Sequence, residues 1–275
     1  MTEHEIAYRG DDGCELFALA VGTGPPLVLL HGGGPDCRSL LPLATMLGDR
    51  ATVLLPDIRG YGRSVCRDRE RHTWQQYADD IASLLDHLGH EQALVGGAGM
   101  GSGIAMRTGL SSPARVSGLV LISPEHRGEQ RPSPKLIAMQ QQMADQILVD
   151  GLDVAWSSWI PMMPEGMAAM VRDALPRADP ASQAAALHAI ATQEPIERLD
   201  ELRALEMPVL VVPGTDPNHP RALGELYRGV LRQPLVIEVD MWKEVADTED
   251  FAAGLAPAIS QFLDEIGVGP AAPAA

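Results

Sequence analysis

Ionisable side chains follow one of the strongest apolar runs in the sequence. Glu125 and His126 come directly after the run that ends near Ser123. A carboxylate and an imidazole together can move protons as a general acid and base. Neighbouring residues seldom face the same way, so the two can also be unrelated surface residues. His219, in the segment Pro217–Pro220, fits a loop residue that caps the following helix better than it fits a base.

Glycine-rich segments point to a second kind of chemistry. The stretch Leu94–Ala105 has the pattern of a buried strand, a tight turn and a helix start, which puts the amide of Met100 at a helix N-terminus, where donors are unpaired. A second glycine-rich segment, Gly32–Gly34, can offer another amide. Backbone amides of this kind can stabilise an anion. The alternative is that these glycines only allow tight turns.

Short apolar runs alternate with helical patterns along most of the chain. A helix is predicted after Thr73, where Gln76 has capping-box spacing, and Gly89 ends its apolar stripe. Residues near 4–21 can add a hairpin at a sheet edge. Continuous apolar runs bounded by Gly, Pro or Asp are typical of strands buried on both faces, and the alternation predicts a doubly wound α/β sheet. The runs are Leu27–Leu30, Thr52–Leu55, Ala93–Val95, Leu119–Ile122, Val209–Val212 and Leu235–Val239.

Several motifs fall in the order found in the α/β-hydrolase superfamily. They are His31–Pro35, Asp57–Ser64, Gly97–Gly101, Pro113–Ile122 and Pro213–Asp216. One glycine motif is weak evidence, but the ordered set resembles this family, in particular its proline iminopeptidase-like and esterase-like members. The resemblance implies an α/β-hydrolase fold, with a mostly parallel doubly wound sheet and a helical cap insertion. It divides the chain into a core (1–124 and 206–266), a cap (125–205) and a flexible tail (267–275). The resemblance also implies that the amides of Gly33 and Met100 form an oxyanion hole, which stabilises a developing oxyanion or enolate without covalent chemistry.

The resemblance also exposes the absence of a nucleophile. The family carries a serine in a G-x-S-x-G turn between a strand and a helix. Here Gly99 occupies the serine position when the motif is aligned from the helix, and Ala98 occupies it when aligned from the strand. Neither residue is nucleophilic. Ser102 is the nearest hydroxyl, but it lies one helical turn further on and is expected to point along the helix.

A second departure concerns the catalytic histidine. The resemblance assigns the triad acid to Asp216 and expects a histidine after the run Leu235–Val239, where Trp242 and Lys243 stand instead. Lys243 could act as a base if desolvation lowered its pKa, or it could be a solvated surface lysine. Trp242 could fill the space of the histidine. Without a histidine, Gly99→Ser is expected to restore little ester hydrolysis.

The predicted cap is rich in methionine and contains two tryptophans. These side chains can form an adaptable apolar pocket wall or simply a core between helices. His31 can serve the oxyanion loop structurally, as that motif's histidine usually does. The candidate substrate-binding residues are His31, Gly32, Gly34, Trp156, Trp159, Met162, Met163 and Trp242.

Composition narrows the possible partners. The net charge of −16 disfavours nucleic acid and anionic membranes, because both require a basic patch. Cys14, Cys37 and Cys66 form neither a disulfide framework nor a metal-ligand spacing, which fits a reducing cytoplasm. The N-terminus lacks the apolar stretch of a signal peptide. We therefore expect a small-molecule substrate or ligand, no cofactor and no metal, with the oligomeric state left open.

Three functions are compatible with these patterns. The first is an enzyme (a hydrolase, lyase or isomerase) that acts on a small, mostly apolar carbonyl, ester or lactone compound. It would use Asp216, Lys243, Glu125 or His126 in acid–base or oxyanion catalysis, without a serine nucleophile. The second is an inactive homologue that binds a ligand or a partner. The third is a serine esterase that uses Ser102.

Overall fold

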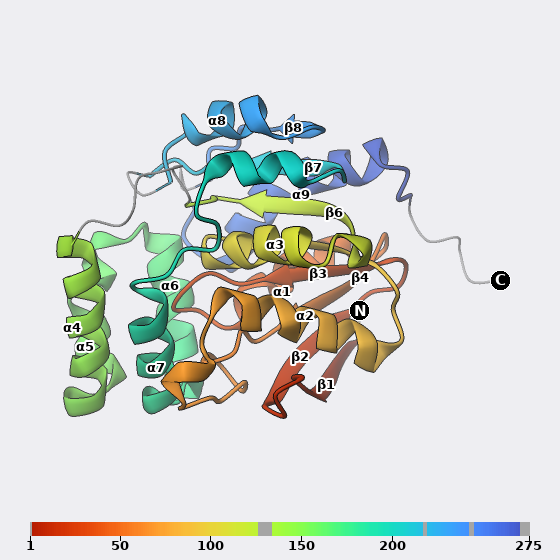
Figure 1. Cartoon of the computed structure of the whole chain (residues 1–275). Helices are drawn as coiled ribbons and strands as arrows, with labels where there is room; N and C mark the ends of the chain where they lie inside the picture. Colours follow the sequence, from red (N-terminus) through yellow and green to blue (C-terminus); the bar gives the residue numbers. More distant parts are fainter. Residues whose placement is uncertain (1, 126–133, 217–218, 242–244, 270–275) are drawn as a thin grey trace.

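A mixed eight-stranded sheet forms the centre of the computed structural model, which describes residues 2–125, 134–216, 219–241 and 245–269 (Figure 1). The strand order is β1-β2-β4-β3-β5-β6-β7-β8. The hairpin β1–β2 pairs antiparallel with β4, and all later pairings are parallel. The predicted α/β-hydrolase fold is confirmed. The strands are β1 Glu3–Arg9, β2 Glu15–Val21, β3 Pro26–Leu30, β4 Thr52–Pro56, β5 Ala93–Ala98, β6 Val116–Ile122, β7 Val209–Val212 and β8 Pro234–Val236.

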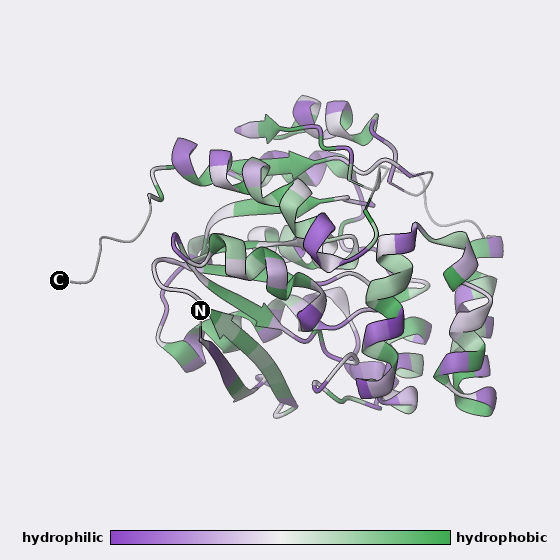
Figure 2. Cartoon of the chain, turned by 180° about the vertical axis from the view of Figure 1, so that it is seen from behind, coloured by the Kyte–Doolittle hydropathy of each residue, from purple (hydrophilic) through white to green (hydrophobic). Residues whose placement is uncertain are grey.

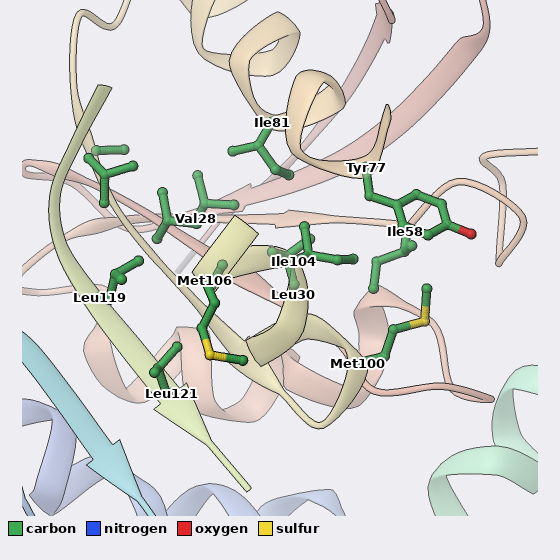
Figure 3. Close-up of a cluster of buried hydrophobic side chains, with 14 of the residues drawn as sticks. Val28, Leu30, Ile58, Tyr77, Ile81, Met100, Ile104, Met106, Leu119 and Leu121 are labelled. Carbon is green, nitrogen blue, oxygen red and sulfur yellow. The ribbon is translucent and has the colours of Figure 1, made fainter. Parts of the chain in front are cut away.

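Helices cover both faces of the sheet. The helices α1 Leu41–Leu47 and α9 Thr248–Glu265 pack on one face, and α2 Trp74–Leu88, α3 Met100–Ser111 and α8 Leu223–Val230 pack on the other. Successive side chains of a strand point to opposite faces, so each strand contributes to both cores. Figure 3 shows the second core, in which Val28 and Leu30 of β3 meet Ile104 of α3. This two-sided burial explains why the strands have continuous apolar sequences.

The start of α2 follows the sequence prediction. The Thr73 hydroxyl accepts a hydrogen bond from the Gln76 amide at 3.0 Å, which satisfies one of the amides left unpaired at a helix start. Gly89 ends the helix in the left-handed conformation, at φ 72°. Between these two residues, Tyr77 and Ile81 face the core, as the apolar stripe predicted.

Four helices lie between β6 and β7 in the sequence and pack together at one end of the sheet (Figure 1). They are α4 Pro134–Asp150, α5 Leu152–Ser157, α6 Glu165–Ala174 and α7 Pro180–Ile190. Short 3-10 turns complete the chain at η1 Cys37–Leu40, η2 Arg69–Arg71, η3 Pro113–Arg115, η4 Ile160–Met162, η5 Leu175–Arg177 and η6 Leu199–Ala204.

The structure corrects the assignment of two residues in this helical layer. Trp156 is not an open pocket wall, because it is buried in the core of the layer and its indole N–H donates to Gln183 Oε1 at 3.1 Å. Met162 is 65% exposed and does not belong to this core. Trp159 and Met163 are half-buried beside the same core. For Trp156, the alternative of a helix–helix core was correct.

Hydropathy follows the layers of the fold. The strands are mostly hydrophobic in Figure 2, whereas the surrounding helices carry both hydrophobic and hydrophilic residues. Among the helices within the described ranges, none has both the length and the apolar character to cross a membrane.

A buried arginine joins three separate segments. Arg59, 1% exposed, follows β4 and donates to both carboxylate oxygens of Asp80 on α2, at 2.9 and 2.6 Å. It also donates to Asp12 in the β1–β2 turn, at 2.7 Å. Burial raises the pKa of Asp80 to about 6. The cluster therefore ties the hairpin and α2 to the loop after β4, and it depends on the arginine to neutralise a carboxylate that is out of water.

We expect Arg59→Met to lower the free energy of unfolding by about 3–5 kcal/mol, because it leaves a buried carboxylate without its partner. Urea unfolding at pH 7.5 measures the change. The matched control is Arg9→Met, which removes a surface pair with Glu15 whose side chains are 70% and 80% exposed. That variant should unfold like the unmodified protein. A loss below about 1 kcal/mol for Arg59→Met would contradict the role given to the cluster.

Candidate active site

The turn between β5 and α3 has an unusual backbone conformation. Gly99 lies at φ 51° and ψ −114°, a region that strains residues with a side chain and that glycine adopts freely. The chain also approaches β3 closely here. A Cβ atom on Gly97 or Gly101 would lie only 2.6 or 2.4 Å from the Leu30 carbonyl oxygen. The turn therefore has the sharp form of a nucleophile elbow, but it presents no side chain at its tip.

Three ionisable side chains gather at this turn. A Cβ atom built on Gly99 would lie 3.4 Å from Glu125 Oε1 and 4.0 Å from His219 Nε2. The imidazole bridges two carboxylates, with Nε2 3.1 Å from Glu125 Oε1 and Nδ1 2.8 Å from Asp216 Oδ2. We call these residues the Asp216–His219–Glu125 triplet. It lies where the side chain of a nucleophile would begin.

Neighbouring parallel strands bring the triplet together. Glu125 follows β6 and Asp216 follows β7, and these strands pair directly. Open α/β sheets place their sites at such carboxyl ends. The backbone amide of His219 donates a hydrogen bond to the Asp216 backbone carbonyl at 3.1 Å, which closes a turn between the two residues. A Cβ atom on Gly214 would lie 2.3 Å from the His219 Cβ, so this turn requires glycine at position 214.

Backbone strain also marks the approach to Glu125. Ser123, at the end of β6, has φ 46°, the one positive φ of a non-glycine residue within the described ranges. Its amide donates to the Val212 carbonyl at 2.8 Å, and its hydroxyl lies 3.1 Å from the Met241 sulfur. A strained backbone conformation of this kind persists only where contacts with the surrounding structure stabilise it. Here it turns the chain out of the sheet just before Glu125.

Two carboxylates determine the charge of His219. Burial of the ring acts to lower the pKa of His219, but hydrogen bonds to Asp216 and Glu125 outweigh it and raise the pKa to about 9. The ring is therefore an imidazolium at neutral pH, with both N–H groups donating. Its side chain is 15% exposed and that of Glu125 is 61% exposed. The triplet thus places the charged His219 ring next to the exposed carboxyl group of Glu125.

His31 has a structural position, which corrects its assignment as a substrate-binding residue. The ring is fully buried. Its Nε2 accepts from the Ile58 amide at 3.0 Å, so the proton is on Nδ1, which donates to the Gly32 carbonyl at 2.8 Å. Burial lowers the pKa of His31 and keeps the ring neutral. Both nitrogens are therefore used in holding the loop.

The glycine loop after His31 lies against the turn at Gly99. A Cβ atom on Gly32 would be 3.6 Å from the Ala98 carbonyl oxygen, and one on Gly33 would be 4.0 Å from the Tyr61 hydroxyl. Met100 is the first residue of α3, so its amide has no partner within the helix. The predicted donors thus come from two segments, the start of α3 and the glycine loop that contacts Ala98.

Contacts with the inserted helices hold the same loop from the other side. A Cβ atom on Gly34 would lie 2.8 Å from the Trp156 ring, so the loop packs directly against the indole. The Gln183 amide of α7 reaches the Gly34 carbonyl at 3.5 Å. Next in the chain, Asp36 accepts from Arg177 at 2.6 Å. Gly34 therefore contacts Trp156 where the loop meets the helical layer. We call this contact region, formed by Gly34, Asp36, Trp156, Arg177 and Gln183, the seam at Gly34.

The sequence predicted part of this site. Asp216 and Glu125 were candidates, and they lie on either side of one imidazole. His219 was interpreted as a loop residue. The signal that could have identified it is its spacing from Asp216, because two residues three positions apart in a turn can contact each other. His126, Trp242 and Lys243 lie outside the described residues.

Within the described ranges, no cluster of His, Cys, Asp or Glu is arranged to hold a metal ion.

The Ser102 side chain lies along α3, as expected from the sequence, and this position does not support the alternative of a serine esterase that uses Ser102. Its side chain is fully buried in α3, and its hydroxyl donates to the Gly99 carbonyl at 2.7 Å. This bond is the local helix-start bond typical of serine. The hydroxyl is therefore directed into the turn of the helix and away from the triplet.

The raised pKa of His219 should make stability depend on pH. Because the folded value of about 9 exceeds the ordinary 6.5, the stabilisation is complete below about pH 6.5 and is lost as pH rises through 9. We expect the free energy of unfolding to fall by about 1–3 kcal/mol between pH 6 and pH 9.5. Urea unfolding of the unmodified protein and of His219→Gln measures the difference. Equal pH slopes for the two proteins would show that His219 is not held as an imidazolium.

Comparison with known proteins agrees with this architecture. Residues 27–249 match the model of the Alpha/beta hydrolase family. The uncharacterized protein Rv2715 of Mycobacterium tuberculosis is 32% identical over 118 residues, which cover 43% of this chain and 34% of that protein. The chain thus spans about a third of the length of the first curated relatives it matches.

Two solved structures share the fold over nearly their whole length. An esterase from Thermogutta terrifontis superposes with a TM-score of 0.78 and 25% identity, over 97% of this chain and 99% of that chain. An enol-lactonase from Burkholderia xenovorans LB400 superposes with a TM-score of 0.76 and 19% identity, over 95% and 99%. With a family model that matches most of its length, this chain belongs to the alpha/beta hydrolase family.

Proposed function

We propose that this protein is a hydrolase that adds water directly to a small, mostly apolar ester or lactone, without forming an acyl-enzyme. One observation carries the proposal. The position that a nucleophile would fill at Gly99 is bordered by Glu125 Oε1 and His219 Nε2, 3.4 and 4.0 Å from where a Cβ would be. A water molecule there would touch a base and an acid at the same time. The esterase and enol-lactonase that share the fold support the choice of substrate class.

Glu125 acts as the base in this reaction. Its carboxylate takes a proton from the water as the oxygen bonds to the carbonyl carbon. The carbonyl oxygen becomes an oxyanion, which the amides of Gly33 and Met100 stabilise. No covalent bond to the protein forms, so a glycine at position 99 is compatible with turnover.

His219 acts as the acid in the second step. The oxyanion reforms the carbonyl, the bond to the alcohol oxygen breaks, and the imidazolium gives its Nε2 proton to the departing alkoxide. Asp216 holds the Nδ1–H, which keeps the ring oriented. Protonated Glu125 then returns its proton to Nε2 across the 3.1 Å contact. The products are one carboxylic acid and one alcohol, or one hydroxy acid from a lactone, and the site is restored.

We expect hydrolysis of short-chain 4-nitrophenyl esters or aliphatic lactones by the unmodified protein. Glu125→Gln and His219→Asn should each lower kcat by about 10²–10⁴-fold, the range typical of a lost acid or base. The matched control is Glu91→Gln, an exposed carboxylate before β5, which should leave kcat unchanged. Full activity in Glu125→Gln would contradict the proposal. An absence of hydrolysis by the unmodified protein would favour a homologue that only binds a ligand.

We expect a serine introduced at Gly99 to be activated by His219 as a base. Gly99→Ser would place a hydroxyl near His219 Nε2 and so complete a Ser–His–Asp arrangement. We expect a fluorophosphonate to label this variant but neither the unmodified protein nor Gly99→Ala, as read by intact-protein mass spectrometry. This revises the expectation that the sequence alone gave for Gly99→Ser, because His219 supplies a base that the sequence did not reveal.

The pH dependence of labelling tests the same arrangement. Only neutral imidazole accepts a proton, so the initial labelling rate of Gly99→Ser should rise about 50-fold between pH 7 and pH 9 for a pKa near 9. The double variant Gly99→Ser, His219→Asn should react no faster than a surface serine. A labelling rate independent of His219 would mean that another base serves this turn.

A further inference from the structure

Tyr61 carries a buried hydroxyl that the proposed reaction does not use. The residue is 1% exposed, and its hydroxyl oxygen has no hydrogen-bond partner among the residues that the structure describes. A buried hydroxyl without a partner destabilises a fold, because it has lost its bonds to water. Such a group calls for a partner that arrives from outside the chain.

The hydroxyl lies beside the glycine loop. It is 4.0 Å from where a Cβ would stand on Gly33, the residue that supplies one of the two oxyanion donors. Burial, with a smaller effect of the Glu125 charge, raises the pKa of Tyr61 well above its ordinary value. The phenol therefore stays protonated and can donate a hydrogen bond at any pH at which the protein works.

The Tyr61 ring is buried, and its backbone belongs to a hydrogen-bonded turn. The Tyr61 amide donates to the Ile58 carbonyl at 2.8 Å, and the Tyr61 carbonyl accepts from the Ser64 amide at 3.0 Å. The ring meets His31 edge-on at 5.5 Å between centroids. His31 is itself held by two hydrogen bonds, so the Tyr61 ring packs against a neighbour that is fixed in place.

We propose that Tyr61 is a substrate-binding residue whose hydroxyl donates a hydrogen bond to the substrate oxygen held at Gly33 and Met100. The location of that oxygen rests on the proposed function. Three donors would then converge on one atom. A carbonyl oxygen has two lone pairs, whereas the oxyanion of a tetrahedral intermediate has three. The third donor is therefore used fully only when the oxyanion forms, and it favours the transition state over the bound substrate.

Tyr61→Phe tests this role through the kinetic constants. We expect kcat to fall about 10–100-fold with little change in KM, since the lost bond forms mainly in the transition state. The melting temperature should stay the same or rise, because the variant removes an unsatisfied buried hydroxyl. The matched control is Tyr77→Phe, a buried tyrosine whose hydroxyl lies 3.1 Å from His72 Nδ1. That variant should lower the melting temperature and leave kcat unchanged.

A binding measurement separates this inference from the proposed function. The probe is methyl phenylphosphonate, a stable tetrahedral anion, titrated by calorimetry into the unmodified protein and into Tyr61→Phe. We expect at least 10-fold weaker binding to the variant. Equal binding, no binding to the unmodified protein, or a lower melting temperature for Tyr61→Phe would each overturn the role of Tyr61. Weaker binding to Tyr61→Phe in a protein that hydrolyses no ester or lactone would instead support Tyr61 and overturn the proposed reaction.

Discussion

The close packing of α3 on β3 is the constraint on which the site depends. Gly101 of α3 and Gly97 of the neighbouring strand β5 both lie against the Leu30 carbonyl of β3, where even one methyl group would clash. Between these two glycines the chain reverses at Gly99, which has φ 51°. The reversal puts the first amide of α3 beside the glycine loop that leaves β3. Both proposed oxyanion donors are thus positioned by one backbone contact, whatever side chain stands at the tip of the turn.

The position of the histidine changes what the chemistry can be. His219 comes from the same loop as Asp216, and it also meets Glu125, so one ring lies between two carboxylates. In the Ser-His-Asp arrangement the imidazole pairs with one carboxylate and serves as a base towards serine. In the proposed reaction, the second carboxylate makes the ring an acid at neutral pH and takes over the role of base. A glycine at position 99 and a carboxyl group at position 125 are consistent with each other in that reaction.

Local patterns were enough to predict the scaffold. Five of the six apolar runs correspond to the buried strands β3 to β7, and the Thr73 cap and Gly89 correspond to the ends of α2, because these signals depend on a few adjacent residues. The sixth run, Leu235–Val239, forms only the short, half-buried strand β8, Pro234–Val236. The order of the glycine motifs predicted where Asp216 would lie. The role of His219 was missed because it depends on two loops, at 125 and 216–219, that are far apart in the sequence. Trp156 was ambiguous because indoles line pockets and fill cores alike, and only the contacts with Gly34 and Gln183 decide between them.

The seam at Gly34 joins two parts of the molecule that are separate in sequence. Trp156 rests on the Gly34 backbone, Gln183 reaches its carbonyl, and Arg177 pairs with the neighbouring Asp36. A change in the helical layer that shifts the indole must also shift the backbone next to Gly33. The helices that would select a substrate and the amides that would stabilise its oxyanion are therefore not independent modules. Evolution or design could exchange this layer only together with the loop beneath it.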